Sequence, residues 1–433
     1  MRRSLSLIAI LALAAAAWAL PGAGTEPAIE ATPVIDRQDQ AVCPFVVATD
    51  SLNTSINVVA PGAKTASVSW PLVGDVAATT KARLVAGGGQ VDPTDVPLSG
   101  VVSAVVEVPS ESAASSVLPH GEGSMAADTC PVSLPDVWYL PGGSTEPGQT
   151  LELHLANPFP SDAVVSVRAS SNLGVEADAA LESFAVPARS TRSVDLSSTF
   201  EFRDSLSVVV QPVEGHVIPA MTQVGEGDLA VWSGTVGSRT VELPVTRTEE
   251  GQHAWLVLVT DSPTAVGYTV DVATEEGGTP TVLEGEIDAS GQVRIPLRRI
   301  FTETEMFGIR VTATTDIGAA VVVNEPGKGQ SVATGTAVQS STWLLPGIPQ
   351  SEATRQLWIM NTGPEPVEVM FRALGGGDVS GANRVKPGAR RVIEVDRATG
   401  RGLLVESTGP VSVGWSVVAG GYLAATTGLP IDG

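Results

Sequence analysis

Histidine, carboxylate and hydroxyl side chains are the groups of this chain that could carry acid–base, nucleophilic or metal chemistry. The four histidines lie at unrelated points of the sequence, and no pair has the H-x-x-x-H spacing of zinc ligands. They are His120, His154, His216 and His253. The motifs of activated nucleophiles and zinc proteases, G-x-S-x-G, S-x-x-K and H-E-x-x-H, do not occur. We therefore expect no catalytic residue, no metal ligand and no cofactor.

Aromatic rings could instead bind a ligand, because they stack on the faces of sugar rings. The candidates are Trp138, Trp255, Trp343, Trp358 and Trp415. Trp138 and Trp343 recur at one position of a repeat, so we expect both in the core at joints between modules. Trp358 lies between Leu357 and Ile359, which are in register with the buried face, so its ring should point the other way. An exposed Trp358 is the best single indication of a ligand surface, and packing on the neighbouring module is the alternative.

The charge balance limits the partners of the protein. Asp and Glu number 47 against 25 Lys and Arg, a formal net charge of −22. Such a field repels nucleic acid and anionic lipid surfaces, so neither is expected as a partner. The carboxylates are scattered, as in Glu249-Glu250 and Glu275-Glu276, and no D-x-D-x-D-G calcium loop occurs. We interpret them as solvated loops and strand faces.

The elements that would position these groups come from a repeat. Three segments open with an apolar residue two positions before a Leu-Pro pair: Trp138-Tyr-Leu-Pro141, Val241-Glu-Leu-Pro244 and Trp343-Leu-Leu-Pro346. An alternating apolar run follows each one and stops at an Asx-containing turn, because Asn and Asp side chains cap such turns through the backbone. The turns begin at Asn157, Asp261 and Asn361, so the third copy has Asp in place of Asn.

A second marker extends the repeat towards the N-terminus. Gly121-Glu-Gly123 recurs as Gly225-Glu-Gly227 and Gly327-Lys-Gly329, at spacings of 104 and 102 residues. This predicts a divergent first copy and four modules in all. The predicted modules are residues 41–135, 136–238, 239–341 and 342–433.

Composition and period together predict the fold class. With 45 Gly and 31 Pro, the chain is punctuated too often for long helices, and strand-length runs recur every eight to twelve residues. A β-propeller is the main alternative, but its blades repeat at about 40 to 50 residues. We therefore predict an all-β fold, a tandem array of four immunoglobulin-like β-sandwich modules.

The N-terminus indicates export. Arg2-Arg3 precede an apolar run from Leu5 to Leu20, and Ala17-Trp-Ala19 resembles a signal-peptidase site. We interpret residues 1–20 as a signal peptide or, if uncleaved, a membrane anchor, and residues 21–40 as a polar linker. The expected location is extracellular or at the cell surface.

The two cysteines are consistent with that location. Cys43 and Cys130 bracket the first module, and an even count in an exported chain favours one disulfide over two free thiols. The bond would close the module and, in the chain-entropy model, stabilise it by about 4 to 5 kcal/mol. A catalytic cysteine is disfavoured because no histidine is near either residue in sequence.

Further motifs characterise the second module. They are the strand end Leu155-Ala-Asn157-Pro158 and the segment Val186-Pro-Ala-Arg-Ser190, which leads to Val194-Asp-Leu196. Together with the aromatic entrance Trp138-Tyr-Leu-Pro141, they resemble secreted actinobacterial proteins of a family of unknown function, built from tandem β-sandwich modules. The resemblance covers modules two to four, and the third departs from it at Val241-Glu. It implies an envelope or extracellular location and carries over no functional residue.

These observations lead to one expected function and two alternatives. The expected function is that of a non-catalytic, exported scaffold or spacer of the cell envelope, which would reach about 150 Å if four modules were extended. The first alternative is a surface adhesin that binds a polysaccharide or an envelope protein through an exposed aromatic or apolar patch. The second is a secreted hydrolase, because two carboxylates at a set distance suffice for a glycosidase.

Overall fold

The computed structural model describes residues 40–431 of the chain. Gaps in this description fall at residues 48–53, 72–76, 86, 94–99, 109–112, 121–123, 226–227, 249–250, 279, 301–304, 326–328, 348–353, 375–379, 396–400 and 420–421. The predicted signal or anchor segment (1–20), and all of the predicted linker except Gln40, lie outside the described residues. The described residues belong to one compact unit, Asp36–Gly433. Within them, no helix has the length and apolar character needed to cross a bilayer.

Strands form almost all of this unit, and they fall into four strand groups in chain order. The first contains β1 (Gln40–Val46), β2 (Ser55–Val59), β3 (Thr65–Pro71), β4 (Ala77–Arg83), β5 (Gly88–Val91), β6 (Val102–Glu107), β7 (Ala113–His120) and β8 (Ser124–Thr129). The second contains β9 (Trp138–Leu140), β10 (Gln149–Asn157), β11 (Ala163–Ser171), β12 (Gly174–Glu176), β13 (Phe184–Val186), β14 (Ser190–Asp195), the short helix α2 (Leu196–Thr199), β15 (Leu206–Glu214), β16 (Ile218–Gly225), β17 (Asp228–Ser233) and β18 (Thr235–Val236).

The other two strand groups follow the same plan. The third contains β19 (Ser238–Thr248), β20 (His253–Val259), β21 (Val266–Ala273), β22 (Thr281–Ile287), β23 (Gln292–Pro296), the 3₁₀ turn η2 (Leu297–Arg299), β24 (Glu305–Glu325) and β25 (Gly329–Thr334). The fourth contains β26 (Ser340–Pro346), β27 (Thr354–Asn361), β28 (Val367–Ala373), β29 (Asn383–Val385), β30 (Ala389–Val395), β31 (Gly402–Ala419), β32 (Tyr422–Thr427) and β33 (Leu429–Pro430).

Each group builds two packed antiparallel layers. In the first group the layers are separate sheets, with strand orders β1-β6-β3-β4 and β5-β2-β7-β8. In the third, the single strand β24 serves both layers, because its first half pairs with β19 and β21 and its second half with β20 and β25. The all-β sandwich prediction is confirmed. Since all groups belong to one compact unit, the division into four domains at the predicted boundaries stays a prediction.

Period-two burial explains why these segments are strands. In β11, Ala163, Val165 and Val167 are buried and the residues between them are only partly buried. Successive side chains of a strand point to opposite faces, so this pattern places one face in the core between the two layers. In the fourth group the same rule gathers Leu357 and Ile359 with the ring of Trp343 in one core cluster.

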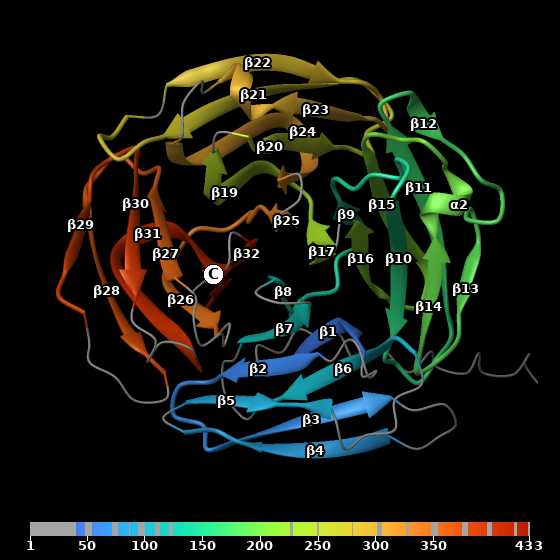
Figure 1. Ribbon diagram of the computed structural model, residues 1–433, viewed down its shortest axis with the longest axis horizontal. Coiled ribbons are helices and arrows are strands. Elements are labelled where there is room, and N and C mark those ends of the chain that lie inside the picture. The colour runs from blue at the N-terminus through green and yellow to red at the C-terminus, as the bar shows by residue number, and fades with distance from the viewer. Residues whose placement is uncertain are drawn as a thin grey trace, which may run out of the picture. The chain divides into compact units, whose positions relative to one another are not determined.

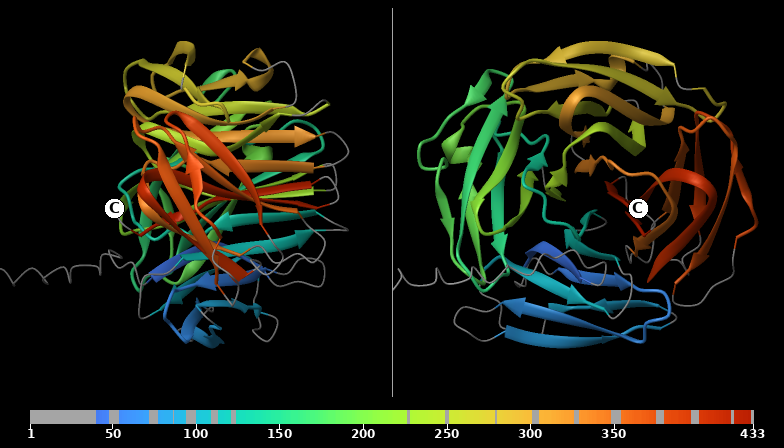
Figure 2. Two further views of the ribbon diagram at one scale, coloured as in Figure 1. Left: turned by 90° about the vertical axis from the view of Figure 1, so that its left-hand side faces the viewer. Right: turned by 180° about the vertical axis from the view of Figure 1, so that it is seen from behind.

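In every group, the strand at one edge of one of the two layers lies at the centre of the unit (Figure 1). We call β8, β17, β25 and β32 the inner strands; each packs against the next, and β32 packs against β8. Small side chains allow this approach, because the third residue of each strand is Ala126, Ala230, Ser331 or Ala424. The space left between the four strands is only about 10 Å³. The view from behind shows the same closed arrangement of the four groups (Figure 2).

Contacts between the first and fourth groups close the ring. Thr129 Oγ1 donates a 2.7 Å hydrogen bond to the carbonyl oxygen of Thr427. Val59 and Ala113 share an apolar cluster with Leu344. The extended row of modules, which would reach about 150 Å, is therefore not the arrangement observed.

Buried polar side chains join neighbouring groups. The Tyr139 hydroxyl of the second group donates to the Asp261 carboxylate of the third. Glu242, only 3% exposed, takes the position of Tyr139 in the next copy and accepts a 2.6 Å hydrogen bond from Thr362 of the fourth group. Equivalent positions thus form equivalent joints with different side chains. Because a buried polar group without its partner is costly, these contacts fix how the groups meet.

The Asx-turn prediction is right at two of its three positions. Asn157 and Asn361 are fully buried, and each accepts a 3.0 Å hydrogen bond from the backbone nitrogen two residues later. In the third group Thr260 takes this role, because its Oγ1 accepts a hydrogen bond from the backbone nitrogen of Ser262. Asp261 is therefore not the substitute for Asn; it lies one residue beyond the turn cap and bonds to Tyr139 instead.

Candidate functional site

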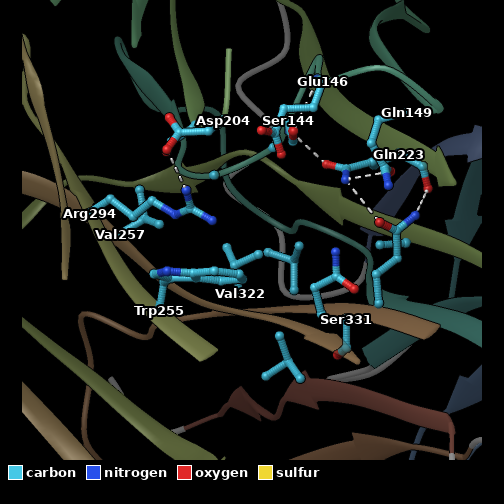
Figure 3. Close-up of a pocket in the computed structure, with 18 residues that line it drawn as sticks. Ser144, Glu146, Gln149, Asp204, Gln223, Trp255, Val257, Arg294, Val322 and Ser331 are labelled. Atoms are coloured by element: carbon cyan, nitrogen blue, oxygen red, sulfur yellow. Dashed lines mark hydrogen bonds and ion pairs between the residues drawn. The ribbon is translucent and has the colours of Figure 1, made fainter. Parts of the chain in front are cut away.

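A pocket opens where the second and third strand groups meet, and we call it the joint pocket (Figure 3). The loop after β9 and strands β10 and β16 contribute one side, and β20, β23, β24 and β25 the other. Its volume is about 70 Å³. Aromatic, cationic, carboxylate and amide side chains all line it.

Trp255 forms the aromatic wall of the joint pocket. Among the described tryptophans it alone is partly exposed, while the others are at most 1% exposed. The Arg294 guanidinium lies 3.8 Å above the centre of the indole. The His253 ring stacks on the same indole, with 5.7 Å between the two ring centres. Such a cation–π contact stabilises the pair and orients both groups.

Arg294 also carries the charge of the site. Its Nη1 lies 3.0 Å from Oδ2 of Asp204 in the second group, so the ion pair bridges the joint. Burial lowers the pKa of Arg294, and the Asp204 carboxylate opposes this shift, so the guanidinium stays charged. The other oxygen of Asp204, Oδ1, is buried and has no hydrogen-bond partner among the described residues.

Amide side chains line the opposite wall. Gln223 Nε2 donates to Oε1 of Gln149 at 3.0 Å and to Oε1 of Gln330 at 2.9 Å. Gln223 Oε1 accepts from the backbone nitrogen of Ser144 at 2.8 Å, and Gln330 Nε2 donates to the Gln223 carbonyl oxygen at 2.7 Å. The network holds the three amides in defined orientations. The pocket therefore offers fixed donors and acceptors beside an aromatic ring, an arrangement suited to binding rather than to proton transfer.

Metal ligands and buried histidines are the other candidates for chemistry in the part of the chain that the structure describes. No cluster of three His, Cys, Asp or Glu side chains occurs there that could hold a metal ion. His154 is fully buried, and its ring nitrogens lie 2.8 Å from the hydroxyls of Ser193 and Thr222. Burial lowers the pKa of His154 to about 3, so it is a neutral structural residue at neutral pH.

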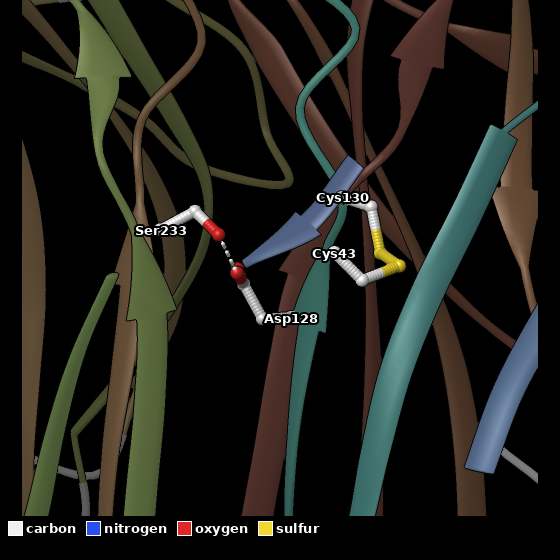
Figure 4. Close-up of a disulfide and its surroundings, with 4 residues drawn as sticks. All are labelled: Cys43, Asp128, Cys130 and Ser233. Carbon is white, nitrogen blue, oxygen red and sulfur yellow. Dashed lines mark hydrogen bonds between the residues drawn. A yellow bond between two sulfur atoms is a disulfide. The ribbon is translucent and has the colours of Figure 1, made fainter. Parts of the chain in front are cut away.

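The predicted disulfide between Cys43 and Cys130 is present, with an S–S distance of 1.99 Å (Figure 4). Cys130 follows inner strand β8, at the position that Gly234, Gly335 and Gly428 occupy after the other inner strands. A side chain at Gly234 or Gly428 would meet the ring of Trp138 or Trp343 at 3.0 Å. The disulfide therefore fastens the end of the inner strand to the first strand where the other groups use tight packing against glycine.

The tryptophans are placed differently from the sequence expectation in one respect. Trp138 and Trp343 are buried, as predicted, and so is Trp415. Trp358 does face away from Leu357 and Ile359, but it is fully buried against Val245 and Ala333 of the third group. Its indole nitrogen donates a 2.8 Å hydrogen bond to Ser416 Oγ. An exposed ligand surface at Trp358 is therefore not observed, because the third group covers that face; packing on the neighbouring module, the alternative interpretation, is what the structure shows.

The joint pocket was only partly visible in the sequence. Trp255 is one of the aromatic candidates, and its place near the start of a strand, two residues after His253, is compatible with an exposed edge. Asp204 and the three glutamines carry no motif, because Asp204, Gln149 and Gln223 lie far apart within the second group and Gln330 comes from the third, so they meet only through the fold.

Comparison with known proteins gives a family match but no function. No curated protein matches the sequence. The crystal structure of Thermotoga maritima 1070 is 13% identical, with 24% of this chain and 96% of that chain covered and a TM-score of 0.22. A mutant of Salmonella alpha-2-macroglobulin is 10% identical with a TM-score of 0.14, and this chain spans 29% of its length. Residues 109–236, from the segment before β7 to the end of β18, match a family of unknown function, DUF5719.

Proposed function

We propose that the protein is a non-catalytic scaffold of the cell envelope that is exported from the cytoplasm. The observation that carries the proposal is the closed ring of strand groups, in which neighbouring groups share buried polar or apolar contacts. A ring closed on itself restricts hinge motion between groups more than a linear array does, since each group is held on two sides. It therefore offers a rigid body on which binding surfaces keep fixed positions.

Two features fit an exported scaffold. The disulfide between Cys43 and Cys130 is of the kind that persists in oxidising compartments and is rare in the cytoplasm. The net charge of −22 keeps the body soluble and away from anionic surfaces. A scaffold that acts in the envelope needs both properties.

Fractionation of cells that express the full chain tests the proposal. We expect the protein outside the cytoplasm, with Cys43 and Cys130 joined in a peptide map made without reductant. The same preparation should hydrolyse no glycoside, ester or peptide substrate above the buffer blank. A cytoplasmic protein with two alkylatable thiols would refute export, and turnover abolished by one Asp or Glu substitution would refute the non-catalytic role.

Saccharide binding in the joint pocket is the second candidate function. Trp255 supplies a partly exposed aromatic ring, one face of which the Arg294 guanidinium already covers. Because the pocket volume is only about 70 Å³, a sugar would bind at its mouth, against the exposed part of the ring, where Asp204, Arg294 and the glutamines offer hydrogen-bonding groups. The candidate ligand surface is therefore at Trp255 and not at Trp358, and its residues come together only in the folded chain.

A glycan array with matched variants tests this second function. We expect Trp255→Ala to lose binding at least about 10-fold, as for loss of an aromatic anchor at a binding site. Trp255→Phe should retain part of the affinity because an aromatic face remains. Exposed Phe202→Ala is the control, since it removes an aromatic side chain outside the pocket. Equal binding by wild type and Trp255→Ala, with unchanged circular dichroism, would exclude the joint pocket as the saccharide site.

A further inference from the structure

A larger pocket lies where the four inner strands end, and we call it the axial pocket. Its volume is about 290 Å³, which is roughly the space of ten water molecules in the liquid. Thr129, Ser233, Thr334 and Thr427 are the last residues of the inner strands, and all four line it. Every strand group thus contributes a hydroxyl at the same position of its repeat.

The rim of the axial pocket is apolar. Val236 and Val338 belong to the segments that follow β17 and β25, and they are 44% and 39% exposed. Leu429 and Pro430 take the corresponding place after β32. Large apolar side chains exposed together around a cavity leave surface that a ligand with an apolar body would cover.

One ionisable side chain, Asp128, lines the pocket among the residues described there. It is partly buried, beside the disulfide, and Ser233 Oγ donates to its Oδ2 (Figure 4). Burial raises the pKa of Asp128 to about 7, and hydrogen bonds from Ser233 and Thr129 only partly oppose this. The adjoining inner strand β17 brings one other carboxyl, Asp228, and that residue is at the far end of the strand.

We propose that the axial pocket binds a small primary ammonium compound that carries an apolar body. An ammonium group has three N–H donors and no acceptor. The Asp128 carboxylate supplies a charged acceptor, and the Ser233 hydroxyl oxygen, which is bonded to it, supplies a second acceptor in the lining. The apolar body would rest on Val236 and Val338. Charge complementarity selects a cation, because the lining carries one acid and no base and the whole chain carries a net charge of −22.

Binding of the ammonium group is coupled to the protonation of Asp128. The ammonium pairs with ionised Asp128, so binding must displace the proton wherever the carboxyl is still protonated. With the pKa of Asp128 near 7, the ionised fraction falls about 30-fold between pH 8 and pH 5.5. We expect the affinity to fall by a similar factor, and about half a proton to be released per ligand bound at pH 7.

Titration calorimetry with benzylamine tests the proposal, and benzyl alcohol is the neutral probe of the same shape. At pH 8 the purified protein should bind the amine at least about 10-fold more tightly than the alcohol, the effect of one charge-assisted contact. Asp128→Asn should abolish this preference. Asp136→Asn should leave it unchanged, because it removes the same charge from an exposed position outside the pocket.

Three results of these titrations would overturn the proposal. Equal affinity for amine and alcohol, an unchanged preference in Asp128→Asn, or no heat at millimolar amine would each overturn the proposal. If Asp128→Asn fails to fold, the wild type alone still decides, through calorimetry at pH 7 in two buffers of different ionisation enthalpy. Release of about half a proton would support pairing with Asp128, and no release would overturn it.

Discussion

Removal of the Trp358 side chain should destabilise the protein strongly, although the sequence indicated an exposed ring. The indole is fully buried between β27 and the third strand group, where it contacts the apolar cluster of Val245, Ala333 and Ala425. Truncation of a buried Trp to Ala typically costs about 3 to 5 kcal/mol through lost transfer energy and the cavity left behind. The hydrogen bond to Ser416 adds about 1 kcal/mol. We therefore expect Trp358→Ala to lower the free energy of unfolding by about 4 to 6 kcal/mol.

Urea unfolding followed by circular dichroism measures this loss, and two variants separate its parts. Trp358→Phe keeps most of the ring volume and loses the indole donor, so it should cost only about 1 to 2 kcal/mol. Trp255→Ala removes a partly exposed ring and should cost clearly less than Trp358→Ala. A loss below about 2 kcal/mol for Trp358→Ala, with an unchanged urea dependence, would show that the third and fourth groups do not pack on this ring.

Three further perturbations probe other parts of the unit. Replacing both Cys43 and Cys130 with Ser should lower the free energy of unfolding by about 4 to 5 kcal/mol, since the bond closes a loop of 87 residues; a change below about 1 kcal/mol in urea unfolding would contradict this. The folded-state pKa of His154 lies below its unfolded value, so its contribution to stability is fully present above about pH 6.5 and is lost as the pH falls towards 3. His154→Gln should therefore reduce the loss of unfolding free energy between pH 6.5 and pH 3. An unchanged loss over that range would show that other groups cause it. Glu242→Ala should cost about 3 kcal/mol or more in urea unfolding, because it leaves Arg310 without its buried partner; a neutral effect would show that this joint is solvated.

Local pattern was sufficient for the features that depend on near neighbours in the chain. Alternation of apolar residues, as at Leu151, Leu153 and Leu155, specifies a strand and its buried face, because the two faces of a strand differ by one residue. The same alternation correctly turned Trp358 away from the core of its own group. The cysteine count and position sufficed for the disulfide, since both residues border the same repeat copy.

Where local pattern failed, the missing information was the identity of the neighbouring group. Trp358 is buried rather than exposed because another repeat copy packs on it, and the sequence of its own strand does not indicate this contact. At the third turn the cap is Thr260, not the Asp beside it. The Asp261 carboxylate is instead committed to Tyr139, which lies 122 residues away. An Asp next to a Thr is ambiguous until the distant partner is known.

The sequence by itself determined the strand content, the repeat of about 100 residues, the net negative charge and the pair of cysteines, because each follows from composition or from spacing within one copy. Only the tertiary structure decided that the copies close into a ring and that hydroxyls and a single acid gather where their inner strands end. The joint pocket likewise combines Asp204 with Trp255 and Arg294 from separate strand groups. Residues that are distant in sequence meet through packing between copies, and the repeat specifies each copy without specifying the angle at which it meets the next.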